Sequence, residues 1–177
     1  MRVLFISNAK SIHTVRWVNA LACRGHEVHL AYVAGHEPGP DGLDGRIGLH
    51  RLPVSGGAGY YLNAISLRRL ASRLRPEVTH AHYASGYGTL ARLARIPYLL
   101  SVWGSDVYEF PYRSSLSMRI VRRNLRRASE LASTSECMAG QVRYVLGDPM
   151  IPITVTPFGV DLKRFDPDRL PPRDASD

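Results

Sequence analysis

Short apolar segments alternate with helical segments along most of this 177-residue chain. We expect strands at residues 2–7, 28–33, 49–54, 78–83, 98–103, 131–135 and 153–156. Segments with apolar residues at helical spacing separate most of these strands. Strands that alternate with helices predict a parallel sheet with right-handed crossovers. The fold class is therefore α/β, a doubly wound and mostly parallel sheet with helices on both faces.

The expected helices end at recognisable signals. Helices are predicted at 13–24, 60–75, 88–95, 112–128 and 136–146. Gly25 follows the first in the position where glycine commonly ends a helix, and Pro76 stops the second. The stretch 35–48 is predicted to be a loop, and the glycine-rich run 55–59 to be flexible.

Polar and ring-bearing residues gather where two neighbouring strands end. His80 and His82 belong to the strand at 78–83, and Trp103, Gly104, Ser105 and Asp106 end the strand at 98–103 or follow it. In open α/β sheets, ligands bind beyond the carboxyl ends of the strands. We therefore expect one crevice that holds a polar substrate.

Two residues are the candidates for catalysis in this crevice. His82 lies nearer its strand end than His80, although either could be a buried, structural histidine. Asp106 can accept hydroxyl hydrogen bonds or act as a general base, and the alternative is a helix cap. Asp106 is a conceivable third ligand for zinc beside the two histidines, but no Cys or further His lies nearby, so no metal is expected.

The loop at 7–13 joins the first strand to the first helix and contributes further candidates. Free N–H groups at a helix N-terminus suit an anion or a sugar hydroxyl. The alternative is that Ser11 only caps the helix. Neither a dinucleotide-binding nor a P-loop glycine pattern is present. The candidate ligand-binding residues are Lys10, Ser11, His13, Trp103 and Ser105, and the aromatic face of Trp103 suits the C–H surface of a sugar.

Basic residues dominate one helix. The net charge is +8, Lys10 and Lys163 are the only lysines, and the segment 112–128 contains no acidic residue. Successive helical residues are rotated by about 100° around the helix axis, which places the arginines in one arc on one side of the helix. The apolar residues Leu116, Ile120, Val121 and Leu125 lie on the opposite side. The arc is either a solvated face or a surface for anionic lipids or phosphorylated acceptors. Nucleic acid is disfavoured, because no aromatic-rich strand pattern is present. The arc comprises Arg119, Arg122, Arg123, Arg126 and Arg127.

The cysteines and the apolar runs suggest a compartment. Cys23 and Cys137 fit no disulfide or metal spacing, and we expect reduced, mostly buried thiols in a cytoplasmic protein. No signal peptide opens the chain, and no apolar run approaches the ~20 residues of a membrane span.

Three motifs in this order resemble family 4 of the retaining glycosyltransferases, whose fold (GT-B) has two facing Rossmann-like domains. They are His80-Ala-His82, Gly104-Ser-Asp106-Val and Thr156-Pro-Phe-Gly-Val-Asp-Leu-Lys-Arg-Phe165. The resemblance extends over essentially the whole chain. Asn8-Ala-Lys10 replaces the glycine pair of the family's first loop, and Trp103 stands where many members carry His.

The resemblance implies the acceptor-binding, N-terminal half of a hexosyl-type glycosyltransferase of cell-surface polysaccharide or lipopolysaccharide synthesis. Residues 1–165 would form this domain, and 166–177 would begin a linker to a C-terminal donor domain. The donor, a UDP- or GDP-sugar, would bind there, so no cofactor is expected in this domain, and the protein could lie at the inner face of the plasma membrane. The alternatives are a GT-B epimerase of sugar nucleotides and a non-enzymatic carbohydrate- or membrane-binding module.

Overall fold

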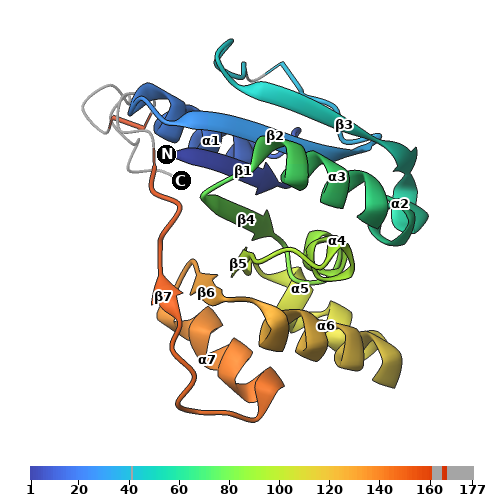
Figure 1. The fold of residues 1–177 in the computed structure, drawn as a ribbon. Coiled ribbons are helices and arrows are strands. Elements are labelled where there is room, and N and C mark those ends of the chain that lie inside the picture. The colour runs from blue at the N-terminus through green and yellow to red at the C-terminus, as the bar shows by residue number, and fades with distance from the viewer. Residues whose placement is uncertain (41, 161–164, 167–177) are drawn as a thin grey trace, which may run out of the picture.

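The computed structural model describes residues 1–40, 42–160 and 165–166, and within them one parallel sheet of seven strands in the order β3-β2-β1-β4-β5-β6-β7 (Figure 1). The strands are β1 (Arg2–Ile6), β2 (Glu27–Ala34), β3 (Gly48–Ser55), β4 (Val78–His82), β5 (Leu99–Ser101), β6 (Glu130–Ser133) and β7 (Thr154–Val155). The helices are α1 (Ile12–Cys23), α2 (Gly56–Leu62), α3 (Ala64–Leu74), α4 (Tyr87–Ala94), α5 (Ser105–Tyr108), the 3-10 helix η1 (Phe110–Arg113), α6 (Ser115–Arg127) and α7 (Glu136–Leu146). The predicted α/β class is confirmed.

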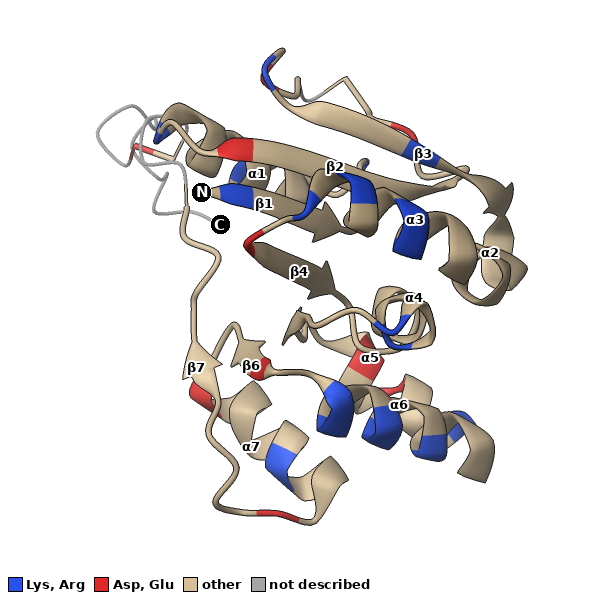
Figure 2. Ribbon diagram, viewed as in Figure 1, with Lys and Arg blue, Asp and Glu red and all other residues tan. Residues whose placement is uncertain are grey.

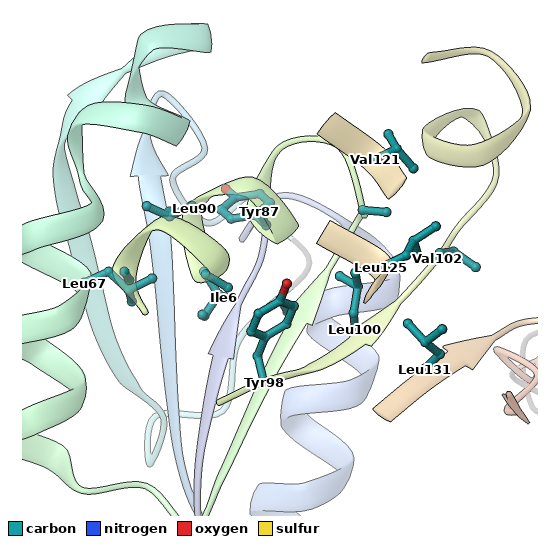
Figure 3. Close-up of a cluster of buried hydrophobic side chains, with 14 of the residues drawn as sticks. Ile6, Leu67, Tyr87, Leu90, Tyr98, Leu100, Val102, Val121, Leu125 and Leu131 are labelled. Carbon is teal, nitrogen blue, oxygen red and sulfur yellow. The ribbon is translucent and has the colours of Figure 1, made fainter. Parts of the chain in front are cut away.

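Alternate residues of β1 enter different cores, because successive strand side chains point to opposite faces of the sheet. Val3 and Phe5 join a cluster with Val18 of α1. Leu4 and Ile6 join a larger cluster with side chains of α3, α4, α6 and α7 (Figure 3). Helices therefore cover both faces, as a doubly wound sheet requires.

The glycine-rich run 55–59 is not the flexible loop that we expected from its composition. It opens α2, and Gly59 lies so close to the Val54 carbonyl and the Val33 side chain that a Cβ would not fit. The predicted helix 60–75 is interrupted at Asn63, which separates α2 from α3. The long basic helix begins at Ser115, because η1 occupies residues 110–113.

The interruption at Asn63 has a physical cause. Its buried amide accepts a hydrogen bond from Val54 N–H (3.0 Å) and donates one to Val54 C=O (2.8 Å). It thereby satisfies both backbone groups of a residue of the edge strand β3. We expect Asn63→Ala to lower the free energy of unfolding by about 2 kcal/mol, since both groups lose their partner. Urea denaturation measures this, and the exposed Ser72→Ala in α3 serves as the control, with a change below ~0.5 kcal/mol. Equal stability of the two variants would contradict this role.

Both cysteines are unpaired, but the prediction that they are mostly buried is wrong. Cys23 and Cys137 are exposed, because each lies on the outward side of its helix. Among the described residues, no helix is long and apolar enough to cross a membrane. Residues 167–177 of the predicted linker lie outside the described residues.

Candidate functional site

A crevice of about 380 Å³ lies beyond the carboxyl ends of four strands, where the sequence predicted a site. Ser7 and Asn8 follow β1, and His36 follows β2. Tyr83 follows β4, and Trp103 follows β5. Helices complete the lining. The full set is Ser7, Asn8, Ser11, His36, Tyr60, Tyr83, Tyr87 and Trp103.

Aromatic rings make up half of the crevice lining: Tyr60, Tyr83, Tyr87 and Trp103. Tyr60 of α2 meets Tyr87 of α4 edge to face, with 5.2 Å between the ring centroids. Tyr83 has a φ of +80°, a conformation that is rare for a non-glycine residue and that recurs at functional sites. Its hydroxyl forms a short hydrogen bond with the Ser105 hydroxyl. Rings beside hydroxyl and amide groups suit a ligand with both C–H surfaces and hydroxyls, such as a sugar.

The protonation of His36 follows from its neighbours. The Tyr87 hydroxyl oxygen accepts from Val33 N–H (3.4 Å), and the same hydroxyl forms a hydrogen bond with Nδ1 of His36 (2.7 Å). In the tautomer in which this hydroxyl donates to Nδ1, the imidazole proton lies on Nε2. Burial, and then the charge of Lys10, lowers the pKa of His36. His36 is therefore neutral near pH 7 and has an N–H to donate.

His82 lies beneath the crevice rather than in its wall. The side chain is fully buried, and Nδ1 is 3.1 Å from the Ser7 hydroxyl. The Trp103 ring covers it, with 4.5 Å between the centroids. Within the described part of the chain, Nε2 has no hydrogen-bond partner. Burial, and then the nearby His80 and His13, lowers the pKa of His82 well below its ordinary value.

Asp106 is not in the crevice, so the expectation that it lines the site is corrected. The side chain has no exposed surface. Oδ1 accepts from Trp103 N–H (3.1 Å) and Gly104 N–H (2.8 Å), and Oδ2 accepts from Ala84 N–H (2.7 Å). Burial raises the pKa of the carboxyl, and the backbone N–H groups oppose the increase. Asp106 ties the loop after β4 to the loop after β5. Gly104, rather than Asp106, is the cap of α5.

Only some of the remaining predicted acceptor-binding residues line the crevice. Ser11 lines the crevice and occupies the N-cap position of α1, and its side chain forms no capping hydrogen bond. Lys10 is exposed near His36. His13 does not line the crevice, because its ring stacks on Phe158 at a centroid distance of 3.7 Å. Ser105 does not line the crevice, and its hydroxyl forms a hydrogen bond with the Tyr83 hydroxyl. The described residues contain no group of three or more His, Cys, Asp or Glu side chains placed to hold a metal ion.

The arginines of the predicted arc have different surroundings in the structure. Arg122 and Arg126 donate to carbonyls of α7, from Nε to Val145 (2.6 Å) and from Nη2 to Leu146 (3.1 Å). Arg127 lies apart, near Arg95. Leu116, expected on the apolar side, is 62% exposed because α6 begins just before it, at the edge of the core.

Comparison with known proteins gives consistent matches. Residues 2–135 match the family described as glycosyl transferase 4-like. The chain is 31% identical over 96 residues to TuaC of Bacillus subtilis (strain 168), whose name ascribes to it a glycosyltransferase role in teichuronic acid biosynthesis. This match covers 52% of the chain and 24% of TuaC.

Two solved structures share the fold at low sequence identity. Sucrose-phosphate synthase from Thermosynechococcus elongatus has a TM-score of 0.72 and 16% identity, over 92% of this chain and 49% of that one. Anabaena Alr3699/HepE, solved in complex with UDP, has a TM-score of 0.60 and 14% identity, over 92% of this chain and 45% of that one. The chain thus spans about a quarter of the curated relative and about half of each of these structures.

Proposed function

Because the chain belongs to the glycosyl transferase 4-like family, we propose that it binds the acceptor in a retaining glycosyl transfer from a nucleotide-sugar. The crevice beyond β1, β2, β4 and β5 is the proposed acceptor site. The observation that carries this proposal is its lining, which combines four aromatic rings with hydroxyl, amide and imidazole groups.

An acceptor sugar in this crevice would use both kinds of group. Its C–H face would lie against Trp103 or Tyr83, where burial of apolar surface favours binding. Its hydroxyls would meet Asn8, Ser11 and the N–H of neutral His36. A neutral His36 donates without placing a second positive charge beside Lys10.

The catalytic role that we propose for His82 depends on movement of the Trp103 ring. Nε2 has no hydrogen-bond partner among the described residues, and it can act as a general base in the tautomer that carries the imidazole proton on Nδ1. The Trp103 ring covers it, so proton transfer with an acceptor requires that ring to move. Asp106 holds the backbone N–H groups of Trp103 and Gly104, so we assign it a positioning role.

The pathway and the donor are also proposals. The glycosyltransferase role in teichuronic acid biosynthesis that the name of TuaC ascribes supports transfer to a cell-surface polysaccharide precursor. The structures that share the fold are about twice as long as this chain, and HepE was solved with UDP. We expect the UDP- or GDP-sugar to bind a second domain, with transfer in the cleft between the two on closure.

Acceptor binding can be tested on the chain itself. Methyl glycosides of glucose, galactose and N-acetylglucosamine, titrated separately, should shift the backbone NMR signals of Asn8, Ser11 and His36. UDP should leave these signals unchanged. Trp103→Ala should weaken the binding about tenfold, within the 1–3 kcal/mol expected for loss of a buried aromatic contact. Tyr144→Ala, which removes a 72% exposed ring on α7, is the control. A crevice that binds UDP and none of the glycosides would contradict the proposal.

A further inference from the structure

A second cavity, of about 660 Å³, lies between η1 and α6. It shares no lining residue with the acceptor crevice. Four arginines of α6 line it, together with hydroxyl groups of Tyr112, Ser114 and Ser115. The full set is Pro111, Tyr112, Ser114, Ser115, Met118, Arg119, Arg122, Arg123 and Arg126.

The four arginines crowd one side of the helix. Arg122 and Arg123 are each three or four residues from Arg119 on one side and from Arg126 on the other, so these side chains are neighbours on successive turns. Among the described residues, none of the four forms an ion pair with a carboxylate. Figure 2 shows α6 with several basic positions and no acidic one. Like charges at this spacing destabilise a helix, and an anion in the cavity would remove this repulsion.

Two of the guanidinium groups are already fixed in place. Arg122 and Arg126 each donate one hydrogen bond to the last turn of α7. A guanidinium carries five N–H donors, so most remain available. Fixed guanidinium groups lose little side-chain entropy when they bind, and their planar fork matches phosphate oxygens. The cavity therefore has the donor set of a phosphate site.

Apolar side chains lie beside this cationic cavity. The Tyr112 ring, 51% exposed, lines it, and Met118 contributes a thioether. Leu116 is 62% exposed and lies three residues before Arg119, one turn away. A small soluble anion has no apolar surface that could pack against these side chains. An amphiphile whose phosphate enters the cavity would bury them.

We propose that the η1–α6 cavity binds the phosphate of an anionic lipid headgroup, with Tyr112 and Leu116 against the adjoining apolar region of the bilayer. Arg119 and Arg123 supply the accessible charge, and Arg122 and Arg126 supply fixed donors. The site would hold the domain at an anionic membrane surface. It does not depend on the proposed acceptor role, because the two cavities are built from different residues.

Co-sedimentation with vesicles tests this proposal. We expect the chain to bind phosphatidylglycerol vesicles and not to bind phosphatidylcholine vesicles. A rising NaCl concentration should release it from the phosphatidylglycerol vesicles. Arg119→Gln with Arg123→Gln should lower the partition coefficient about 30-fold, as expected for loss of two basic residues near an anionic surface. Both side chains are exposed and bond to no carbonyl of α7, so the variant should fold. Arg68→Gln with Arg69→Gln, two exposed positions of α3, removes the same charge elsewhere and should cause less than a threefold loss.

The other outcomes overturn the proposal. Equal losses in the two double variants would show that only the overall charge matters. Binding of inorganic pyrophosphate, measured by calorimetry, without binding of phosphatidylglycerol vesicles would assign the cavity to a soluble phosphate compound. Equal binding to neutral vesicles would remove any role for the arginines. Leu116→Ser should weaken vesicle binding and leave pyrophosphate binding unchanged, and an unchanged partition coefficient would exclude the apolar contact.

Discussion

Asp106→Ala should lower the free energy of unfolding by about 4 kcal/mol. The carboxylate accepts from three backbone N–H groups, those of Ala84, Trp103 and Gly104. Each buried donor left without a partner costs about 1–3 kcal/mol. The loss is a large part of the 5–15 kcal/mol that holds a typical domain together. Urea denaturation followed by circular dichroism gives the value.

Asp106→Asn separates the position of the side chain from its charge. The amide oxygen can still accept from Trp103 and Gly104, whereas its NH2 group would face the N–H of Ala84, so we expect about half of the alanine effect. Glu109→Ala, a 67% exposed side chain at the C-cap of α5, serves as the control and should change stability by less than ~0.5 kcal/mol. If Asp106→Ala were as stable as the control, the loops would not depend on this carboxylate.

The sequence predicted the position of the crevice more accurately than it predicted which residues line it. The carboxyl ends of parallel strands meet at one edge of a sheet, so β1, β4 and β5 identified the crevice, and Ser11 and Trp103 were predicted correctly to lie in it. Asp106 was misassigned because the one-dimensional pattern does not show where a side chain points. A polar residue after a strand can face either a ligand or the backbone of the neighbouring loop. Three nearby N–H groups decide this for Asp106, and one of them, that of Ala84, is 22 residues away.

The crevice residues that were missed depend on contacts between distant segments. Tyr60 reaches the crevice because the glycine-rich run forms α2, and this in turn requires the close approach of Gly59 to β3. His36 was the most accessible to prediction, because it follows the end of β2 just as Ser7 follows the end of β1. The interruption of the predicted helix at Asn63 could not be predicted from the spacing of apolar residues, since its cause is two hydrogen bonds between the Asn63 side chain and the backbone of β3.

Acidification from pH 7 to pH 5 should destabilise the protein through two buried histidines. Burial lowers the pKa of His80 to about 4 and that of His82 well below its ordinary value. In the unfolded chain both should titrate near 6.5. Between these values the unfolded state binds more protons than the folded state, so stability falls as the pH falls through this window. The loss by pH 5 is about 2 kcal/mol for His80, and His82 adds to this loss in the same direction.

A double variant tests this origin of the acid sensitivity. His80→Gln retains a donor or acceptor near Nε2, which meets the Ser101 hydroxyl, and His82→Asn retains one near Nδ1, which meets the Ser7 hydroxyl. Neither amide titrates, so the variant should lose at least about 2 kcal/mol less than the wild-type chain between pH 7 and pH 5, whatever its stability at pH 7. A smaller slope should remain, because burial also lowers the pKa of His13, His36 and His50. Urea denaturation at half-unit steps of pH measures both slopes. Equal slopes would mean that His80 and His82 take up protons in the folded state, and that Trp103 does not isolate His82 from solvent.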